Sequence, residues 1–346
     1  MARMESLAPL LLAWYDAGHR TLPWRQTRDP YPIWLSEIML QQTRVEAVKG
    51  YYARFLGEIP TIEALSRCDD QRLHKLWEGL GYYSRVRNLK KAAQVIMERH
   101  GGQFPREYAQ VLALPGIGEY TAGAICSIAF NQPTPAVDGN VLRVMARLLD
   151  DDSPIDLPQT KKRVTALLAE SYPSRAGDFT QALMELGATL CGPNRKPGCG
   201  DCPCREICLA HLHGRAEALP VKSPKKERRQ EDWTVFILSC DGRYALEKRP
   251  GTGLLAGLWQ FPNVSGALDT EKALEAVTAL GLRPREILRQ VRRKHIFTHI
   301  QWNMTGIYLE VSQAAGDFRW LTPEEIRTQA ALPTAFRLFW EEIDHA

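Results

Sequence analysis

The chain has 346 residues, of which 45% are hydrophobic and 24% are charged, and its formal net charge is +4 at pH 7. This composition is typical of a folded globular protein and excludes a disordered tail, a collagen and a coiled-coil rod. At about 150 residues per domain, the length predicts two or three folded units. No apolar run approaches the roughly 18 to 20 residues that a membrane span requires. The small net charge permits a polyanionic partner without requiring one.

The N-terminus predicts an amphipathic helix. Its apolar stretch, Leu7 to Tyr15, lies between Glu5 and Asp16 and lacks a small-residue cleavage site. These features distinguish the stretch from a secretory signal peptide.

Residues 1 to 212 as a whole predict an all-α region. Apolar residues recur at helical spacing, whereas alternating β-branched residues are nearly absent. The periodic stretches are Ile33 to Tyr52, Gln71 to Gly79, Arg87 to Arg99, Tyr120 to Ala129 and Val141 to Leu149. Pro32 is typical of a first helical turn and predicts a helix that continues past Val45.

Residues 213 to 232 predict an exposed linker. They contain Pro220 and Pro224, few apolar residues and a basic run. The run consists of Lys222, Lys225, Lys226, Arg228 and Arg229.

The remaining residues, 233 to 346, predict a separate α+β domain. Strands are expected at 233–239, 243–249 and 295–311, and helices near 270–281 and 323–330. The apolar phase of the last strand changes at Gly306, which predicts a β-bulge there. Thr322 and Glu325, with Pro323 between them, predict a capping box at the start of the second helix.

The run Leu114 to Gly123 predicts two helices joined by a tight turn. Its glycines, Gly116 and Gly118, let the backbone approach another group closely, and the second helix starts at once. The free N–H groups of that helix and the positive end of its dipole are suited to a phosphate. A tight turn without a ligand explains the spacing equally well. The pattern is similar to a helix-hairpin-helix that grips a DNA backbone without reading its sequence.

Two carboxyl groups are candidates for catalytic roles. Glu37 lies among apolar residues of a predicted helix, so its pKa should be raised and it can hold a proton near neutral pH. Asp138 is placed to cap the helix that follows it. A solvent-exposed Glu37 and an Asp138 that only caps are the simpler alternatives. If the fold brings the two together, they supply the acid and the anion that glycosidic cleavage requires.

Five of the eight cysteines lie between residues 191 and 208. Such a cluster at the end of a long helical region indicates a metal site in a reducing compartment. Cys191, Cys199, Cys202 and Cys208 supply four thiolates at one place, with Cys204 left over. The spacing fits a zinc site and an iron–sulfur cluster about equally, although a single C-x-x-C pair disfavours a zinc ribbon.

Together these motifs resemble the helix-hairpin-helix DNA glycosylase superfamily, and within it the MutY family of adenine glycosylases. The resemblance covers nearly the whole chain. It rests on the cysteine cluster and on the segments PWR at 23–25, SEIMLQQT at 36–43, GLGYYSR at 79–85, LPGIG at 114–118 and VDGNV at 137–141. It implies that adenine mispaired with 8-oxoguanine or guanine is flipped out of the duplex and excised in base excision repair.

The resemblance also implies roles for individual residues. Glu37 matches the general acid, and Asp138 matches the carboxylate that stabilises the oxocarbenium-like sugar. The adenine pocket matches at Trp24 and Arg25, and positions near the reacting water match at Asn140 and Glu185. Gln42 and Tyr82 match the residues that wedge into the duplex. The expected DNA-binding residues are Gln41, Gln42, Tyr82, Gly116 and Gly118.

Tyr120 distinguishes this chain from a sibling branch of the superfamily. Related glycosylases with strand-cleaving lyase activity resemble the chain but carry a lysine at this position, whose amine forms a Schiff base with the sugar. A phenol cannot form a Schiff base. We therefore expect a monofunctional glycosylase with Tyr120 in its catalytic site.

The resemblance further implies a 4Fe–4S cluster held by Cys191, Cys199, Cys202 and Cys208. The first cysteine interval is one residue longer than the family's usual spacing, which makes Cys204 a rival to Cys202. Such a cluster would be structural, because it would hold a basic loop against phosphate. The charges of that loop come from Arg195, Lys196 and Arg205.

The C-terminal third resembles a Nudix fold, beginning with the segment GLLAGLWQFP at 253–262. The predicted helix at 270–281 lacks the glutamate pattern that holds magnesium in a Nudix hydrolase, so we expect recognition without hydrolysis. Phe297, Thr298 and His299 resemble the family's Phe-Ser-His loop that contacts 8-oxoguanine. An ordinary strand with a surface histidine is the simpler alternative. The preceding basic residues are suited to phosphates, and they are Arg289, Arg292, Arg293 and Lys294.

The sequence therefore predicts a bacterial-type adenine glycosylase: a monomer that acts on double-stranded DNA at the nucleoid, in the cytoplasm, and does not bind a membrane. The expected domains are a catalytic region at 1–212, a linker at 213–232 and a Nudix-like domain at 233–346. Within the first, about 22–130 form a six-helix subdomain, whereas 1–21 and 131–212 form an iron–sulfur subdomain. Two alternatives stay open: a lyase-bearing pyrimidine-damage glycosylase and a non-catalytic DNA-binding protein with a zinc site.

Overall fold

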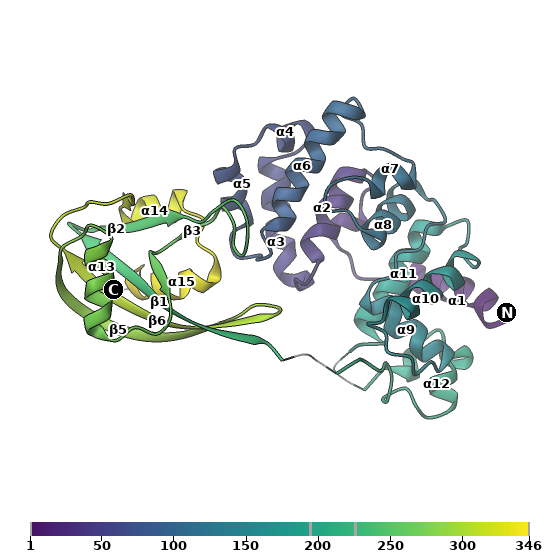
Figure 1. Ribbon diagram of the computed structural model, residues 1–346. Coiled ribbons are helices and arrows are strands. Elements are labelled where there is room, and N and C mark those ends of the chain that lie inside the picture. Colours follow the sequence, from purple (N-terminus) through teal and green to yellow (C-terminus); the bar gives the residue numbers. More distant parts are fainter. Residues whose placement is uncertain (1, 194–195, 225–226, 345–346) are drawn as a thin grey trace. The chain divides into compact units, whose positions relative to one another are not determined.

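The computed structural model describes residues 2–193, 196–224 and 227–344 (Figure 1). The chain forms two compact units, one made of residues 1–67 with 88–225 and the other of residues 68–87 with 226–346. Of the basic residues singled out in the sequence, Arg195, Lys225 and Lys226 lie outside the described residues. Among the described residues, no helix is both long enough and apolar enough to cross a membrane.

Every regular element among the described residues of the first unit is a helix, which confirms the predicted all-α fold. Its α-helices are α1 (Ala2–Gly18), α2 (Pro30–Leu40), α3 (Val45–Glu58), α4 (Ile62–Arg67), α6 (Ser84–Arg99, from Asn88 onward), α7 (Tyr108–Leu112), α8 (Glu119–Phe130), α9 (Gly139–Leu149), α10 (Pro158–Ala169), α11 (Ala176–Thr189) and α12 (Leu209–Leu212). Short 3-10 turns lie at Pro23–Arg25, Cys199–Asp201 and Arg205–Ile207.

Two apolar clusters bring the functional segments of this unit together. The larger one packs α1, α9 and α11 around fully buried side chains such as Leu11, Met145 and Phe179. The smaller one joins α2 to α8 through Ile33, Ala124 and neighbouring residues. Because α2 carries Glu37 and α8 carries Tyr120, this second cluster sets the two polar side chains against each other.

The predicted helix that continues past Val45 is wrong. Helix α2 ends at Leu40, and α3 begins only at Val45. Between them Gln42 adopts a left-handed backbone conformation with φ of 60°, and the Thr43 N–H donates to the Leu40 carbonyl at 3.3 Å. A non-glycine residue in this region costs energy and interrupts the helical hydrogen bonds.

The second unit is built around a seven-stranded mixed sheet (Figure 1). Its strands are β1 (Arg229–Cys240), β2 (Arg243–Lys248), β3 (Trp259–Gln260), β4 (Asn263–Ser265), β5 (Pro284–Ile296), β6 (Ile300–Val311) and β7 (Arg319–Leu321). The main path runs β3-β2-β1-β6-β5, with β4 paired to β1 and β7 paired to β2. The pair β1–β6 is parallel, and the pair β5–β6 is antiparallel.

Helices cover both faces of this sheet. Helix α13 (Thr270–Ala279) packs on one face, and α14 (Pro323–Gln329) and α15 (Thr334–Asp344) pack on the other. The capping box of α14 is confirmed, since Thr322 and Glu325 exchange side-chain and backbone hydrogen bonds of 2.8 and 3.2 Å. The predicted α+β domain is thereby confirmed, and the unit also includes α5 (Asp70–Trp77) from the first half of the sequence.

The predicted bulge at Gly306 is wrong. Strand β6 pairs with β1 in unbroken register through Gly306, and the register shifts lie in β5 instead, between Pro284 and Arg289. The apolar phase changes because the two faces of β6 pack on different helices. Met304 and Tyr308 belong to the apolar cluster of α14 and α15, whereas Ile307, Leu309 and Val311 belong to the cluster of α13. A strand that becomes buried on both faces loses its simple alternation.

Candidate active site

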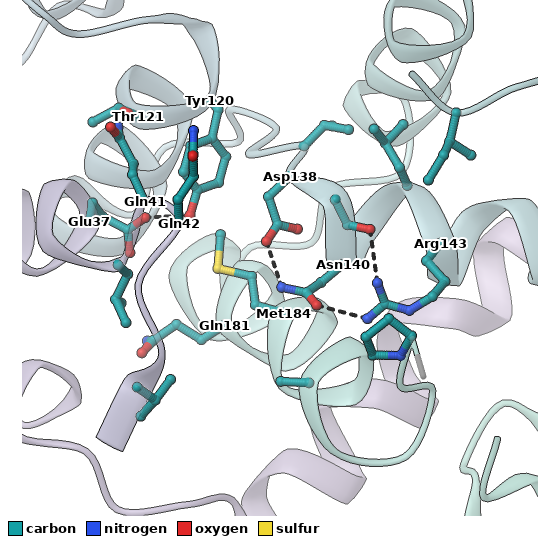
Figure 2. A pocket seen from close by; sticks show the side chains of 18 of the residues that line it. Glu37, Gln41, Gln42, Tyr120, Thr121, Asp138, Asn140, Arg143, Gln181 and Met184 are labelled. Carbon is teal, nitrogen blue, oxygen red and sulfur yellow. Dashed lines mark hydrogen bonds between the residues drawn. The ribbon is translucent and has the colours of Figure 1, made fainter. Parts of the chain in front are cut away.

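A cavity of about 1300 Å³ lies within the first unit (Figure 2). Its walls come from the 3-10 turn at Pro23–Arg25, from α2 and the turn after it, from the start of α8, from the start of α9 and from α11. The expected site residues that line it are Trp24, Arg25, Glu37, Gln41, Gln42, Gly118, Tyr120, Asp138 and Asn140. Residues from segments distant in the sequence therefore meet at one cavity.

Glu37 forms the acidic centre of this cavity. Its side chain comes from the last turn of α2, is only 5% exposed and accepts a hydrogen bond of 2.5 Å from the Tyr120 hydroxyl at Oε2. Burial raises the pKa of Glu37 to about 7, and the charge of Asp138 adds to this; the Tyr120 bond and the Arg25 charge act in the opposite direction. The Tyr120 pKa is raised well above its usual value, chiefly by burial, so the phenol remains a donor.

Asp138 is the second carboxyl group at the cavity. It caps α9 by accepting the Val141 N–H at 2.8 Å through Oδ1, as the sequence predicts, and it accepts Asn140 Nδ2 at 2.7 Å through Oδ2. Burial raises the pKa of Asp138, and these hydrogen bonds oppose the rise by stabilising the anion. The close approach of Gly123 to the Pro135 carbonyl, where a Cβ atom would stand 2.1 Å from the oxygen, lets α8 pack against the segment that leads to Asp138.

A chain of hydrogen bonds runs from Asp138 through Asn140 to Arg143 (Figure 2). From Arg143 it continues to the cysteine region. Arg143, one turn further along α9, donates to Asn140 Oδ1 at 2.8 Å and to the Gly187 carbonyl at 2.6 Å. Its Nε donates to the Cys191 carbonyl at 2.7 Å. Arg143 is 6% exposed, so a buried guanidinium anchors this partly buried network and orients Asn140 and, through it, Asp138.

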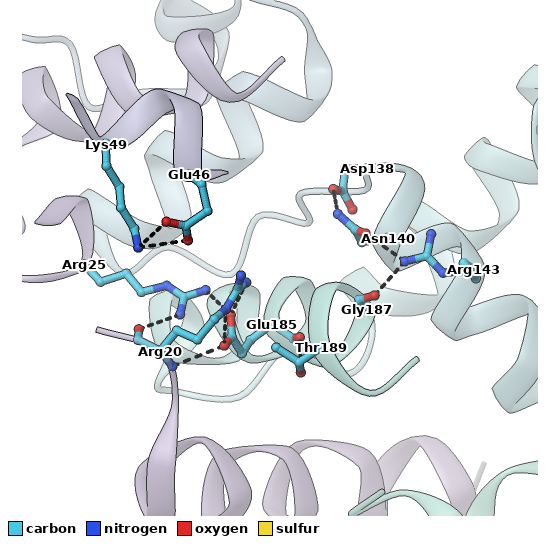
Figure 3. A network of polar contacts seen from close by, with 10 residues as sticks. All are labelled: Arg20, Arg25, Glu46, Lys49, Asp138, Asn140, Arg143, Glu185, Gly187 and Thr189. Atoms are coloured by element: carbon cyan, nitrogen blue, oxygen red, sulfur yellow. Dashed lines mark hydrogen bonds and ion pairs between the residues drawn. The ribbon is translucent and has the colours of Figure 1, made fainter. Parts of the chain in front are cut away.

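Arg25 is held by a buried carboxylate (Figure 3). Glu185, from α11, accepts Arg25 Nη2 at 2.7 Å and Arg20 Nη2 at 2.8 Å. Although burial acts to raise it, the net pKa of Glu185 is lowered to about 2 by the hydrogen bonds and charges of the two arginines. The Glu185 carboxylate thus holds Arg25 at the cavity, where the arginine charge lowers the pKa of Glu37.

The turn between α7 and α8 has the expected helix-hairpin-helix form. Gly116 takes a positive φ of 77° there, and a Cβ atom on it would lie 2.5 Å from Asn88 Cβ. Gly118 is the N-cap of α8 and supplies no side chain to its first N–H groups. A side-chain-free helix N-terminus at the edge of the cavity is a suitable place for an anion.

The five clustered cysteines line a second, apolar pocket between α9, α11 and the loop that follows. Arg147 donates to Cys191 Sγ at 3.1 Å, so a buried cation contacts one of the clustered sulfur atoms. Cys204 is 3% exposed and packs into the large apolar cluster, whereas Cys191, Cys199, Cys202 and Cys208 are half-buried. A hydrogen bond with Cys204 lowers the pKa of Cys202 to about 7 and raises that of Cys204.

Five cysteine side chains that line one pocket have the donor chemistry that a thiolate-ligated group requires. Among the described residues, no three His, Cys, Asp or Glu side chains converge closely enough to hold a single metal ion.

The expected recognition residues lie in the second unit. Phe297, Thr298 and His299 form the turn between β5 and β6, closed by the Phe297 N–H, which donates to the Ile300 carbonyl at 2.8 Å. Phe297 packs edge-on against Trp302. Tyr82 belongs to the same unit, is 47% exposed, and its hydroxyl lies 3.3 Å from Thr298 Oγ1. The three residues thus lie in a turn rather than within a strand.

Sequence reasoning missed several residues of the cavity. Arg143 and Arg20 bind residues 44 and 165 positions away, and no local pattern indicates such partners. Gln181 and Met184 line the cavity from α11, where their spacing is that of an ordinary buried helix face. The only available signal was Arg143 among the apolar residues of α9, because a buried arginine requires partners.

Comparisons with known proteins agree with this geometry. Residues 35–174 match the HhH-GPD superfamily of base excision DNA repair proteins, and residues 234–342 match the NUDIX domain. The chain resembles the structure of a thermostable thymine-DNA glycosylase, with a TM-score of 0.56 and 30% identity over 61% of this chain and 98% of that one. A trapped endonuclease III–DNA intermediate shares the fold, at 23% identity and a TM-score of 0.50 over 59% of this chain and 93% of that one.

Fold and site thus define a helix-hairpin-helix base excision DNA repair glycosylase joined to a Nudix domain. The rat adenine DNA glycosylase is 36% identical over 96% of this chain and 77% of its own length, and the human one is 35% identical over 98% and 75%. The chain belongs to the adenine DNA glycosylase family.

Proposed function

We propose that this protein is a monofunctional DNA glycosylase that flips adenine out of duplex DNA and hydrolyses its N-glycosidic bond when adenine lies opposite 8-oxoguanine or guanine. The observation that carries the proposal is the convergence of Glu37 and Asp138 on one cavity. An acid for the leaving group and an anion for the sugar are the two groups that glycosidic cleavage needs.

Glu37 supplies the proton. With a pKa of about 7, a large fraction of its side chains is protonated at neutral pH. Because Tyr120 occupies Oε2, Oε1 is the oxygen that carries this proton. Transfer to the adenine ring lets the base take the electron pair of the breaking C–N bond. The ionised Glu37 then accepts a proton from the water that attacks the sugar.

Asp138 stabilises the cation that the departing base leaves behind. Its hydrogen bonds from Val141 and Asn140 favour the ionised form, and an anion held in place lowers the energy of an oxocarbenium-like sugar. Glu37 thus acts as the acid and Asp138 as the anion, since of the two only Asp138 has two hydrogen-bond donors that stabilise its charge.

Tyr120 supports hydrolysis without strand cleavage, because a phenol cannot form the Schiff base that lyase activity requires. Purified enzyme should therefore leave the abasic strand intact after excision. Nicking without added base would contradict the monofunctional assignment.

The opposite base is read in the second unit, by the turn 297–299. The Thr298 hydroxyl is a donor and acceptor at an exposed position beside Tyr82, suited to the edge of a purine. We assign no diphosphate hydrolysis to this domain, because Glu271 and Glu275 do not form the magnesium-binding pattern.

We also propose that Cys191, Cys199, Cys202 and Cys208 hold a 4Fe–4S cluster. When bound, the cluster crosslinks the loop between α11 and α12 and has a structural role. The protein acts as a monomer on double-stranded DNA, at the nucleoid in the cytoplasm.

The test is single-turnover base release from duplexes that differ only in the base opposite adenine. Wild-type protein should release adenine fastest opposite 8-oxoguanine, more slowly opposite guanine and least opposite thymine. Glu37→Gln should bind the same duplexes without releasing base. If Glu37→Gln still excises adenine, Glu37 is not the acid. If the variant loses both DNA binding and excision, its melting curve shows whether it has failed to fold.

A further inference from the structure

Helix α5, the residue after it and the first turn of α6 carry four side chains that bind backbone groups at the end of α14, in the segment after α14 and in the loop before β3, all within the second unit. The contacts are Gln71 Nε2 to the Gln329 carbonyl at 2.9 Å, Lys75 Nζ to the Ala330 carbonyl at 3.2 Å, the Leu332 N–H to Glu78 Oε1 at 2.8 Å, and Arg87 Nη1 to the Ala256 carbonyl at 2.8 Å. Backbone groups keep their positions better than flexible side chains, so these contacts fix α5 to the end of α14 and to the segment that follows it.

The two central side chains are themselves paired. Lys75 Nζ lies 2.6 Å from Glu78 Oε2, and the two side chains are only 26% and 17% exposed. The segment that they bind, residues 330–332, is buried, and on its other side the Trp259 N–H donates to the Ala331 carbonyl. We call this arrangement the Lys75–Glu78 clamp.

Glu78 lies four residues before Tyr82, and contacts of Arg85 hold the chain between them. The Arg85 guanidinium lies over the rings of Trp77 and Tyr82, 5.2 and 5.6 Å from their centroids. It also donates to the carbonyls of residues 80 and 81, at 3.0 and 3.1 Å. The chain from α5 to Tyr82 is thereby held in one shape, although Tyr82 itself has a left-handed backbone with φ of 47°.

We propose that the Lys75–Glu78 clamp helps the protein to discriminate the base opposite adenine, because it holds Tyr82 in a fixed position beside the turn 297–299. The inference rests on the proposed function. Discrimination by one polar group requires that the group be held to within a fraction of an ångström. Lys75 and Glu78 bind protein backbone, so they act through Tyr82 and Thr298 and are positioning residues.

The experiment compares Glu78→Ala with Glu78→Gln. Alanine removes the acceptor of the Leu332 N–H, whereas glutamine retains an oxygen in the same place. Two quantities are measured: hydrogen exchange of the Leu332 amide, and the ratio of kcat/KM for adenine opposite 8-oxoguanine to that opposite guanine. Glu63→Ala is the matched control, because it removes an exposed carboxylate paired with Arg67 on α4, in the first unit.

In Glu78→Ala the Leu332 amide should exchange faster, and the ratio should fall on the order of tenfold, the effect of one lost hydrogen bond to a charged group. Glu78→Gln should restore both toward wild type, and the control should change neither. A ratio that stays unchanged while the amide loses protection overturns the positioning role, as does an amide that stays protected. Wild-type protein with no preference for 8-oxoguanine overturns the proposed function instead.

Discussion

The hydroxyl of Tyr120 donates a hydrogen bond of 2.5 Å to Glu37 Oε2, which joins the start of α8 to the last turn of α2. This bond lowers the pKa of Glu37, whereas burial, the larger effect, raises it, and the net value is about 7. Tyr120 therefore adjusts the acid strength of Glu37 from the position at which the resemblance leads us to expect a lysine in the lyase branch.

Replacing Tyr120 by phenylalanine should raise the pKa of Glu37 further, because the donor that favours the anion is lost. The alkaline limb of the excision rate should then move to higher pH. Single-turnover rates between about pH 5 and about pH 9 measure this limb. Tyr108→Phe is the control, since that hydroxyl makes only a long, exposed bond to the Glu119 carbonyl. A limb that stays in place in Tyr120→Phe would contradict the proposed coupling.

Replacing Glu37 by glutamine should stabilise the protein above neutral pH while abolishing excision. The folded pKa is raised from 4.5 to about 7, so between these values the unfolded state loses its proton first and the wild type loses stability as pH rises. The difference should be absent near pH 4, grow up to pH 7 and reach at most about 3 kcal/mol above it. Denaturant unfolding of both proteins at acidic and alkaline pH measures it. If the stability of both proteins depended on pH in the same way, the pKa of Glu37 would not be raised by folding.

Replacing Asn140 by alanine should slow excision and shift its acidic limb. The Asn140 amide favours the ionised form of Asp138, so its loss should raise the pKa of Asp138 and move that limb to higher pH. A hydrogen bond to a charged group contributes about 1.5 to 3 kcal/mol, which corresponds to about ten- to a hundredfold in rate. The pH profile separates this effect from a loss of folding, which would lower the rate at every pH without moving the limb.

Local sequence patterns predicted the elements better than their ends. The helical and α+β halves follow from apolar periodicity, and the cap at Asp138 and the box at Thr322 follow from hydrogen bonds within four residues. The end of α2 does not, because it depends on a left-handed backbone at Gln42, a conformation that a glutamine rarely adopts and that the apolar pattern does not indicate. The grouping of α5 with the sheet depends on contacts across about 250 positions of sequence, such as that between Glu78 and Leu332, which no local pattern indicates.

The candidate site shows the same division. Motifs indicated Glu37, Tyr120 and Asp138, because each stands in a short segment with its own physical reason. The residues that hold these side chains in place could not be predicted from motifs. Arg143 and Arg20 take their roles from Asn140, Gly187 and Glu185, and these partners become neighbours only when α1, α9 and α11 pack together.

Replacing Glu185 by glutamine should destabilise the protein and weaken excision. The side chain is 2% exposed and pairs with Arg20 and Arg25, and a buried pair that loses one partner costs about 3 to 5 kcal/mol. The folded pKa is lowered to about 2, so this stabilisation is present above about pH 4.5 and is lost as pH falls toward 2. Denaturant unfolding at both ends of this range tests it. Glu46→Gln, in an exposed pair with Lys49 (Figure 3), should change neither stability nor rate.

Serine substitutions should decide between Cys202 and Cys204 as the fourth ligand of the proposed cluster. Wild-type protein purified without oxygen should show the broad visible absorption and the iron and sulfide content of a 4Fe–4S cluster. Cys202→Ser should lose most of this absorption. Cys204→Ser should keep it, because the Cys204 thiol is buried against the apolar cluster of the first unit and should cost only packing stability. The reverse result would make Cys204 the ligand, and colourless wild-type protein that contains zinc would replace the cluster with a zinc site.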